Sequence, residues 1–169
     1  MTPTGYLDTN LVSGLARENL GDELVALREL LWRRKQGAIE LYTSHITAEE
    51  LARIPAELRA RHEDVYLLLD DVPAVGEQFQ MPTVIRGGPG SRIVGAPIVQ
   101  DAALAQLRSI LPDETDARHV FQAAKNGVDY FVTCDYRTIV KHAAAVQAAV
   151  GIVACLPSQL VAELAAATS

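Results

Sequence analysis

The sequence "DARHVFQAAKNGVDYFVTCD", residues 116 to 135, contains a helix, a turn and a strand in direct succession. Its first half carries a helical pattern, and Gly127 follows where a helix commonly ends in a left-handed residue. Residues 128 to 133 then form an apolar, strand-like run. Asp116 stands near the start of the helix and Asp135 directly after the strand. A strand that follows a helix this closely is typical of α/β proteins.

The same alternation of helical and strand-like patterns runs through the rest of the chain. Further strands are expected at residues 5–7, 39–43, 72–75 and 152–154, and Pro73 places the third of these at an edge of the sheet. Helices are expected at 11–19, 22–35, 48–53, 56–69, 99–111, 114–126, 136–150 and 157–166. Strands separated by helices predict an α/β fold with a mostly parallel sheet and helices on both of its faces.

One stretch interrupts this alternation, namely "MPTVIRGGPGSRIVGAP" at residues 81 to 97. Its glycine and proline content predicts a solvent-facing loop or a loose hairpin, with Arg86 and Arg92 on either side of the tip. The chain has 169 residues and no internal repeat, so we predict a single domain over residues 1 to 169 that carries this loop.

Composition narrows the class of protein. Hydrophobic residues make up 49% of the chain and charged residues 21%, which indicates a globular domain. The net charge of −6 argues against a broadly basic surface for nucleic acid, but it allows an acidic site neutralised by cations. The two cysteines, Cys134 and Cys155, are expected to be reduced thiols. No signal-like or membrane-spanning pattern is present, so we expect a cytoplasmic protein.

Acidic and polar residues recur where the predicted strands end. Parallel α/β sheets place functional groups at the carboxyl ends of their strands. Asp8 and Asn10 follow the first strand, Glu49 and Glu50 follow the second, and Asp135 follows the fourth. Asp116 differs, because it begins the helix that precedes a strand.

Each of these residues also has a structural explanation as a helix cap. Asn10 can cap a helix that begins at Leu11, and Asp135 can cap one that begins at Tyr136. Thr47 and Glu50 have the spacing of a capping box, and Asp116 lies three residues after a predicted cap at Asp113. Taken one at a time, these positions favour the capping explanation, so they carry functional weight only as a set.

As a set they resemble the PIN-domain family, in particular the VapC-like endoribonuclease toxins. The resemblance rests on "YLDTN" at residues 6 to 10, "SHITAEEL" at 44 to 51, the stretch from 116 to 135, and the order of elements between them. It implies a PIN-like, three-layer α/β/α fold with about five parallel strands. It also implies acids that converge on one or two Mg²⁺ or Mn²⁺ ions.

Carried over to this chain, the family's four catalytic acids match Asp8, Glu50, Asp116 and Asp135. Glu49 competes with Glu50, but the family's second acid directly precedes an apolar residue, as Glu50 precedes Leu51. Asp8, Asp116 and Asp135 are expected to ligate the principal metal, and Glu50 to assist through a second ion or ordered water. Polar residues that support such a site match Asn10, Ser44 and Thr133.

The resemblance therefore implies a metal-dependent ribonuclease that hydrolyses RNA phosphodiester bonds. A divalent cation would activate a water and neutralise charge on the phosphoryl oxygens. Tentative contacts to RNA phosphates come from basic residues on two helices and the loop: Arg118, Arg137, Lys141, Arg86 and Arg92. A VapC-like protein would also be the toxin of a type II toxin-antitoxin pair, with a partner antitoxin and commonly a homodimer.

Two alternatives stay open. One is a catalytically inactive PIN-like module that binds RNA or protein. The other is a metal-dependent hydrolase of small phosphorylated molecules, although such enzymes prefer a second acid two residues after the first, where this chain has Asn10. His119 stands one helical turn after Asp116, and since no second histidine has ligand spacing we expect it at the helix surface or the edge of the core.

Overall fold

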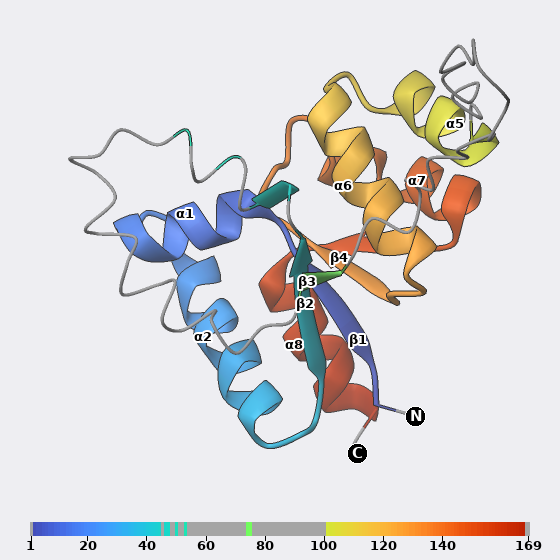
Figure 1. Ribbon diagram of the computed structural model, residues 1–169. Coiled ribbons are helices and arrows are strands. Elements are labelled where there is room, and N and C mark those ends of the chain that lie inside the picture. The colour runs from blue at the N-terminus through green and yellow to red at the C-terminus, as the bar shows by residue number, and fades with distance from the viewer. Residues whose placement is uncertain are drawn as a thin grey trace, which may run out of the picture.

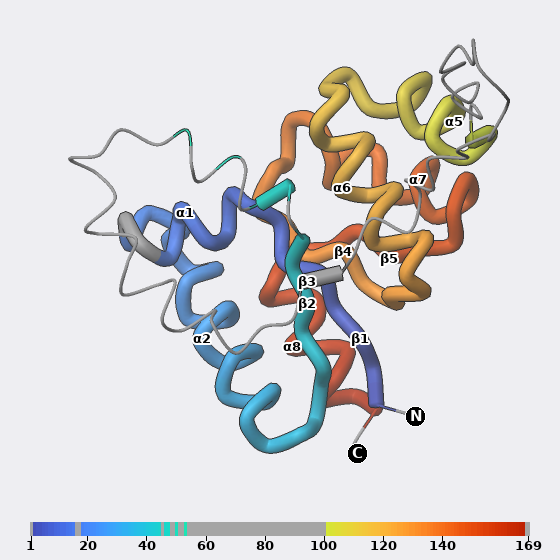
Figure 2. Tube along the Cα trace, viewed as in Figure 1, coloured from blue at the N-terminus to red at the C-terminus, as the bar shows by residue number. Residues whose placement is uncertain are grey.

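The computed structural model describes residues 2–44, 46, 47, 50, 53, 74–75 and 101–167 (Figure 1; Figure 2). The helices predicted at 48–53 and 56–69 and the loop predicted at 81–97 lie outside the described residues, apart from Glu50 and Arg53.

The described strands form a parallel sheet in the order β3-β2-β1-β4-β5. Strands β2 (Glu40–Ser44), β1 (Thr4–Leu7), β4 (Tyr130–Val132) and β5 (Val153–Cys155) make up its body, and every neighbouring pair is parallel. The two residues of β3 (Ala74–Val75) pair with the end of β2. The predicted parallel sheet is thus confirmed, with its third strand at an edge as Pro73 indicated.

Helices cover the sheet on two sides, which gives three layers (Figure 1). One layer holds α1 (Thr9–Arg17), α2 (Asp22–Lys35) and α8 (Pro157–Ala167). The other holds α5 (Ala102–Ile110), α6 (Glu114–Lys125) and α7 (Ala143–Val150). The α/β/α architecture expected from the sequence is therefore confirmed. None of the helices in the described ranges is both long and apolar enough to cross a bilayer.

Two hydrophobic cores lie on the two faces of the sheet, and successive strand residues alternate between them. Leu7 and Val132 pack with the layer of α1, α2 and α8, whereas Tyr6 and Phe131 pack with the layer of α5, α6 and α7. Tyr6 and Phe131 stack with ring centroids 5.2 Å apart. This alternation follows from the two-residue repeat of a strand. It sends Tyr6 toward α6, the helix that carries Asp116 and His119.

Local signals in the sequence determine where several elements end. Gly127, two residues after the end of α6, has φ 68°, the left-handed conformation predicted for it. Asp113 caps α6, since its side chain accepts from the backbone N–H groups of Thr115 and Asp116. The capping role predicted for Asp113 is thus confirmed. Cys134 and Cys155 are free thiols, as expected.

Three predicted helix starts were wrong. Helix α5, expected from residue 99, begins at Ala102, and the Asp101 side chain caps it. Helix α1 begins at Thr9 with Asp8 in the capping position, so Asn10 lies inside the helix and does not cap it. The helix predicted to begin at Tyr136 is replaced by a turn, a short 3-10 helix (Val140–His142) and then α7. The cause is Asp135, whose Oδ1 accepts from the N–H groups of Arg137 and Thr138 at 2.9 and 2.8 Å and so organises a turn.

Candidate active site

Because the strands are parallel, the predicted acids lie together near the carboxyl ends of the strands. Asp8 follows β1, Asp135 lies three residues after β4, and β1 and β4 are hydrogen-bonded neighbours. Glu50 lies beyond the end of β2, on the other side of β1. Asp116 enters from the first turn of α6. The four acids therefore come from four segments that are distant in sequence.

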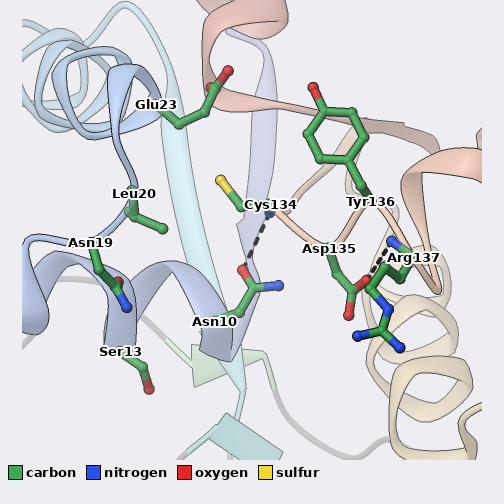
Figure 3. Close-up of a pocket in the computed structure, with 10 residues that line it drawn as sticks. Asn10, Ser13, Asn19, Leu20, Glu23, Cys134, Asp135, Tyr136 and Arg137 are labelled. Atoms are coloured by element: carbon green, nitrogen blue, oxygen red, sulfur yellow. Dashed lines mark hydrogen bonds between the residues drawn. The ribbon is translucent and has the colours of Figure 1, made fainter.

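Asp8 is buried and is held by Thr133. Thr133 Oγ1 donates to Asp8 Oδ2 at 2.7 Å and accepts from Asn10 Nδ2 at 2.9 Å and from the Asp135 N–H at 3.0 Å. Asn10 Oδ1 in turn accepts from the N–H of Cys134 at 3.3 Å (Figure 3). Asn10 and Thr133, predicted as supporting residues, thus connect Asp8 with the backbone that carries Asp135.

Burial makes Asp8 an unusual carboxyl group. Its pKa is raised to about 6, chiefly because burial removes the carboxyl group from water. The charge of Asp116 contributes to this rise, while His119 and the Thr133 hydroxyl oppose it. Only 5% of Asp8 is exposed, so its negative charge is poorly solvated. A bound cation or a proton would relieve the cost of that charge.

Asp116 and Asp135 have opposite pKa shifts. Burial raises the pKa of Asp116, and the charges of Asp113 and Asp135 add to the effect. Burial also acts to raise the pKa of Asp135, but the Thr138 hydroxyl and the N–H groups of Thr138 and Arg137 outweigh it, so the pKa of Asp135 is lowered. Asp135 is therefore ionised beside Asp116, whose charge is disfavoured.

The Thr138 hydroxyl lies between these two acids. It is near enough to lower the pKa of both carboxyl groups, yet its buried oxygen has no partner at hydrogen-bonding geometry among the described residues. A buried hydroxyl without a partner is costly, which makes this oxygen available to a bound water or ion.

His119 is buried within the site, so the helix-surface position expected from the sequence was wrong, whereas the alternative position at the edge of the core agrees with its contact to Tyr6. Only 1% of His119 is exposed. Its Nε2 lies 2.9 Å from Glu50 Oε2, and its Nδ1 lies 2.6 Å from the hydroxyl of Tyr6. Ser44, the third predicted supporting residue, bonds the same Tyr6 hydroxyl at 2.6 Å. Among the described residues, the hydrogen-bonded path from Ser44 to Glu50 runs through Tyr6 and His119.

Glu50 is correspondingly stabilised as a carboxylate. Burial acts to raise its pKa, but hydrogen bonds from His119 and Thr9 and the charges of His119 and Arg53 outweigh it and lower the pKa. The competing residue, Glu49, lies outside the described residues.

An open cleft of about 630 Å³ lies between α1, the start of α2 and the segment after β4, and of the four candidate acids it is lined by Asp135 (Figure 3). Asp135 and Asn10 belong to its wall, as do the exposed side chains of Tyr136 and Arg137. Of the predicted RNA contacts, Arg137 lines the cleft, whereas Arg118 and Lys141 do not. Arg86 and Arg92 lie outside the described residues.

The chemistry of the acids suits a hard divalent cation. Carboxylates and a hydroxyl are oxygen donors, which Mg²⁺ and Mn²⁺ prefer. As the side chains stand, the described part of the chain contains no group of three or more His, Cys, Asp or Glu residues close enough to hold a metal ion. The side chains thus have the oxygen donors that such a cation prefers, but the carboxylates would have to move closer together to bind it.

Comparison with protein-family models finds none that matches this chain, and comparison with curated proteins finds no match.

Proposed function

We propose that this protein is a divalent-metal-dependent endoribonuclease of PIN-like type, in which acids at the carboxyl edge of the sheet bind Mg²⁺ or Mn²⁺. The observation that supports this most is the buried Asp8 carboxylate. Burial and the neighbouring Asp116 raise its pKa to about 6, while Thr133 holds it in place. Strongly perturbed carboxyl groups at the carboxyl edge of a parallel sheet are typical of functional sites.

Asp8, Asp116 and Asp135 would hold the principal cation, with Glu50 at a second ion or an ordered water. When bound, a divalent cation supplies an activated water and neutralises charge on the phosphoryl oxygens. Thr133 orients Asp8, and the N–H groups of Arg137 and Thr138 fix one oxygen of Asp135. These contacts reduce the rearrangement that binding requires.

The residues that line the cleft favour a polynucleotide substrate rather than a small phosphate ester. Its wall combines Asp135 with Tyr136, of which 58% is exposed, and with the Arg137 guanidinium. Single-stranded nucleic acid binds where bases stack on aromatic rings and phosphates meet basic side chains. RNA lying in this cleft would pass directly beside Asp135.

A role as the toxin of a type II pair, with an antitoxin and a homodimeric state, belongs to the same proposal. Its support is the outer surface of α2, where Val25 and Trp32 are 71% and 57% exposed. They are seven residues apart, which places them on one side of the helix. Two exposed apolar side chains on one side of a helix offer a surface against which a second protein could pack.

Cleavage of a single-stranded RNA pool is the direct test. The wild-type protein should cut RNA in the presence of Mn²⁺ or Mg²⁺ and lose this activity in EDTA. Asp116→Asn should abolish cleavage, whereas Asp129→Asn should retain it. Asp129 is the matched control because it directly precedes β4, at the amino ends of the strands and away from the four acids. There its side chain accepts hydrogen bonds from Thr4.

The outcomes separate the three functions. Folded wild-type protein that binds RNA but cuts nothing with either metal would favour the inactive binding module. Hydrolysis of a small phosphate ester without cleavage of RNA would favour the small-molecule hydrolase. RNA cleavage that survives Asp116→Asn would show that the activity lies elsewhere.

A further inference from the structure

His119 contacts three elements of the site through its two ring nitrogens. It lies on α6, one turn after Asp116. Its Nδ1 faces the Tyr6 hydroxyl of β1 at 2.6 Å, and its Nε2 faces Glu50 Oε2 at 2.9 Å and Thr9 Oγ1 at 3.4 Å. The imidazole ring also packs edge-on against the Tyr6 ring, with centroids 5.8 Å apart. Both nitrogens are thus occupied, and the ring has little freedom to rotate.

The partners of the ring determine which nitrogen carries the proton. An ionised carboxylate accepts hydrogen bonds and cannot donate them, so Nε2 must donate to Glu50. When the ring is neutral, Nδ1 is then an acceptor, and the Tyr6 hydroxyl donates to it. Burial raises the pKa of Tyr6 and keeps the phenol protonated for this purpose.

The chain of hydrogen bonds continues in one direction beyond Tyr6. Because the Tyr6 proton points to His119, the Tyr6 oxygen accepts from Ser44, whose Oγ lies 2.6 Å away. Ser44 Oγ accepts in turn from the N–H of Ile46 at 3.2 Å. Aligned hydrogen bonds polarise one another, and this series ends on the Glu50 carboxylate. Tyr6, Ser44 and His119 are each at most 2% exposed, so water does not compete.

We propose that His119 is a positioning residue, which fixes the Glu50 carboxylate relative to Asp116 and is itself oriented by Tyr6 and Ser44. The part that concerns metal rests on the proposed function. Glu50 follows β2 and Asp116 belongs to α6, so these two acids have no common backbone element. His119 supplies the connection, because it shares a helix with Asp116 and bonds Glu50 directly.

A purely structural His119 would have different consequences. It would contribute stability through its hydrogen bonds, and replacing it would lower stability without changing what Glu50 does. A positioning His119 acts through Glu50, so its effect on metal binding should vanish when the Glu50 carboxylate is absent. This dependence is measurable as coupling in a double-mutant cycle.

The first experiment reads the tautomer of His119 by long-range ¹H–¹⁵N correlation in metal-free protein at mildly alkaline pH. We expect a proton on Nε2 and none on Nδ1. Tyr6→Phe should shift the Nδ1 resonance, because it removes the hydrogen-bond donor to that nitrogen, while Glu50 keeps the proton on Nε2. His119→Gln identifies the signal, and His142, in the 3-10 helix, is the control whose spectrum should not respond to Tyr6→Phe. A wild-type His119 protonated on Nδ1 would overturn the proposal, whatever the activity of the protein.

The second experiment measures Mn²⁺ affinity by calorimetry in a cycle of His119→Leu and Glu50→Gln. Loss of an outer-shell contact of this kind commonly weakens metal binding by about 10- to 100-fold. We expect such a loss in His119→Leu, partial recovery in His119→Gln, and no added loss when His119→Leu is combined with Glu50→Gln. Circular dichroism checks that each variant folds.

The two ways of failing can be told apart. Additive effects in a wild-type background that binds Mn²⁺ and cuts RNA would overturn the role of His119 alone. If wild-type protein with the expected Nε2 tautomer binds no Mn²⁺, then the metal-directed role of His119 fails together with the proposed function.

Discussion

Thr133 donates its hydroxyl to Asp8 Oδ2 over 2.7 Å, and this one hydrogen bond joins the ends of two neighbouring strands. The same oxygen accepts from Asn10 and from the backbone N–H of Asp135. Thr133 is wholly buried, so water cannot replace its hydroxyl. The position of Asp8 relative to Asp135 therefore depends on a group that touches no solvent.

Thr133→Val removes this hydroxyl while keeping nearly the same shape. We expect Mn²⁺ binding to weaken by about tenfold, since Asp8 loses its orienting donor. Calorimetric titration measures the change. Thr43→Val is the matched control, because the buried Thr43 hydroxyl has no partner among the described residues and its removal should cost nothing. Equal effects of the two substitutions would contradict the orienting role of Thr133.

Asp8 should make the metal-free protein less stable as the pH rises. Its pKa of about 6 in the folded protein lies above the ordinary value of 3.8, so between these values the folded state binds more protons than the unfolded state. Stability should therefore increase as the pH falls through this window. Asp8→Asn removes the contribution of Asp8 to this dependence and should stabilise the protein by about 1 to 3 kcal/mol at pH 8, with the difference lost near pH 4.

Urea denaturation of both proteins in EDTA, from about pH 4 to pH 8, measures this difference in the free energy of unfolding. Excess Mn²⁺ provides the control, because it should stabilise the wild-type protein and leave Asp8→Asn unchanged. A constant difference across the pH range would show that the Asp8 carboxylate is not strained in the folded state.

Arg137 should contribute to the salt dependence of RNA binding. It lines the cleft beside Asp135 and its side chain is exposed. In an Asp116→Asn background, which prevents cleavage, Arg137→Gln should reduce the slope of log affinity against log salt by about 0.7, as expected for one lost phosphate contact to a single strand. Fluorescence anisotropy with a labelled RNA measures the slope.

Lys35→Gln is the control for Arg137. Lys35 is the last residue of α2 and lies near the start of β2, at the amino ends of the strands, whereas the acids lie at the carboxyl ends. Its replacement should leave the slope unchanged. If the two substitutions lowered the slope equally, RNA would be bound by diffuse surface charge, and the cleft would have no special role.

The sequence was sufficient to predict the layers of the fold and the edge of the sheet that carries the acids. The bounds of α2, at residues 22 and 35, were predicted without error, and Gly127 adopts the expected left-handed backbone. These features depend on local periodicity and local steric limits, which are readable in one chain. Parallel sheets place functional groups at the carboxyl ends of their strands, and this rule predicted that Asp8 and Asp135 lie near each other.

The connection of His119 to the site could not be predicted in this way. Its partners Tyr6 and Glu50 are 113 and 69 residues away in sequence, and only the packing of α6 on β1 brings them together. A signal did exist, since His119 is one turn from Asp116 and Tyr6 is two residues from Asp8. The start of α7 was missed for a related reason, because Asp135 satisfies the N–H groups of Arg137 and Thr138 in a turn.

The most direct test of the metal-dependent site is a calorimetric Mn²⁺ titration of wild-type protein beside Asp8→Asn and Asp135→Asn. These two acids follow neighbouring strands and are linked through Thr133. We expect the wild-type protein to bind Mn²⁺ and both folded variants to lose binding. Unchanged binding in both variants, or no binding by folded wild-type protein, would contradict the site.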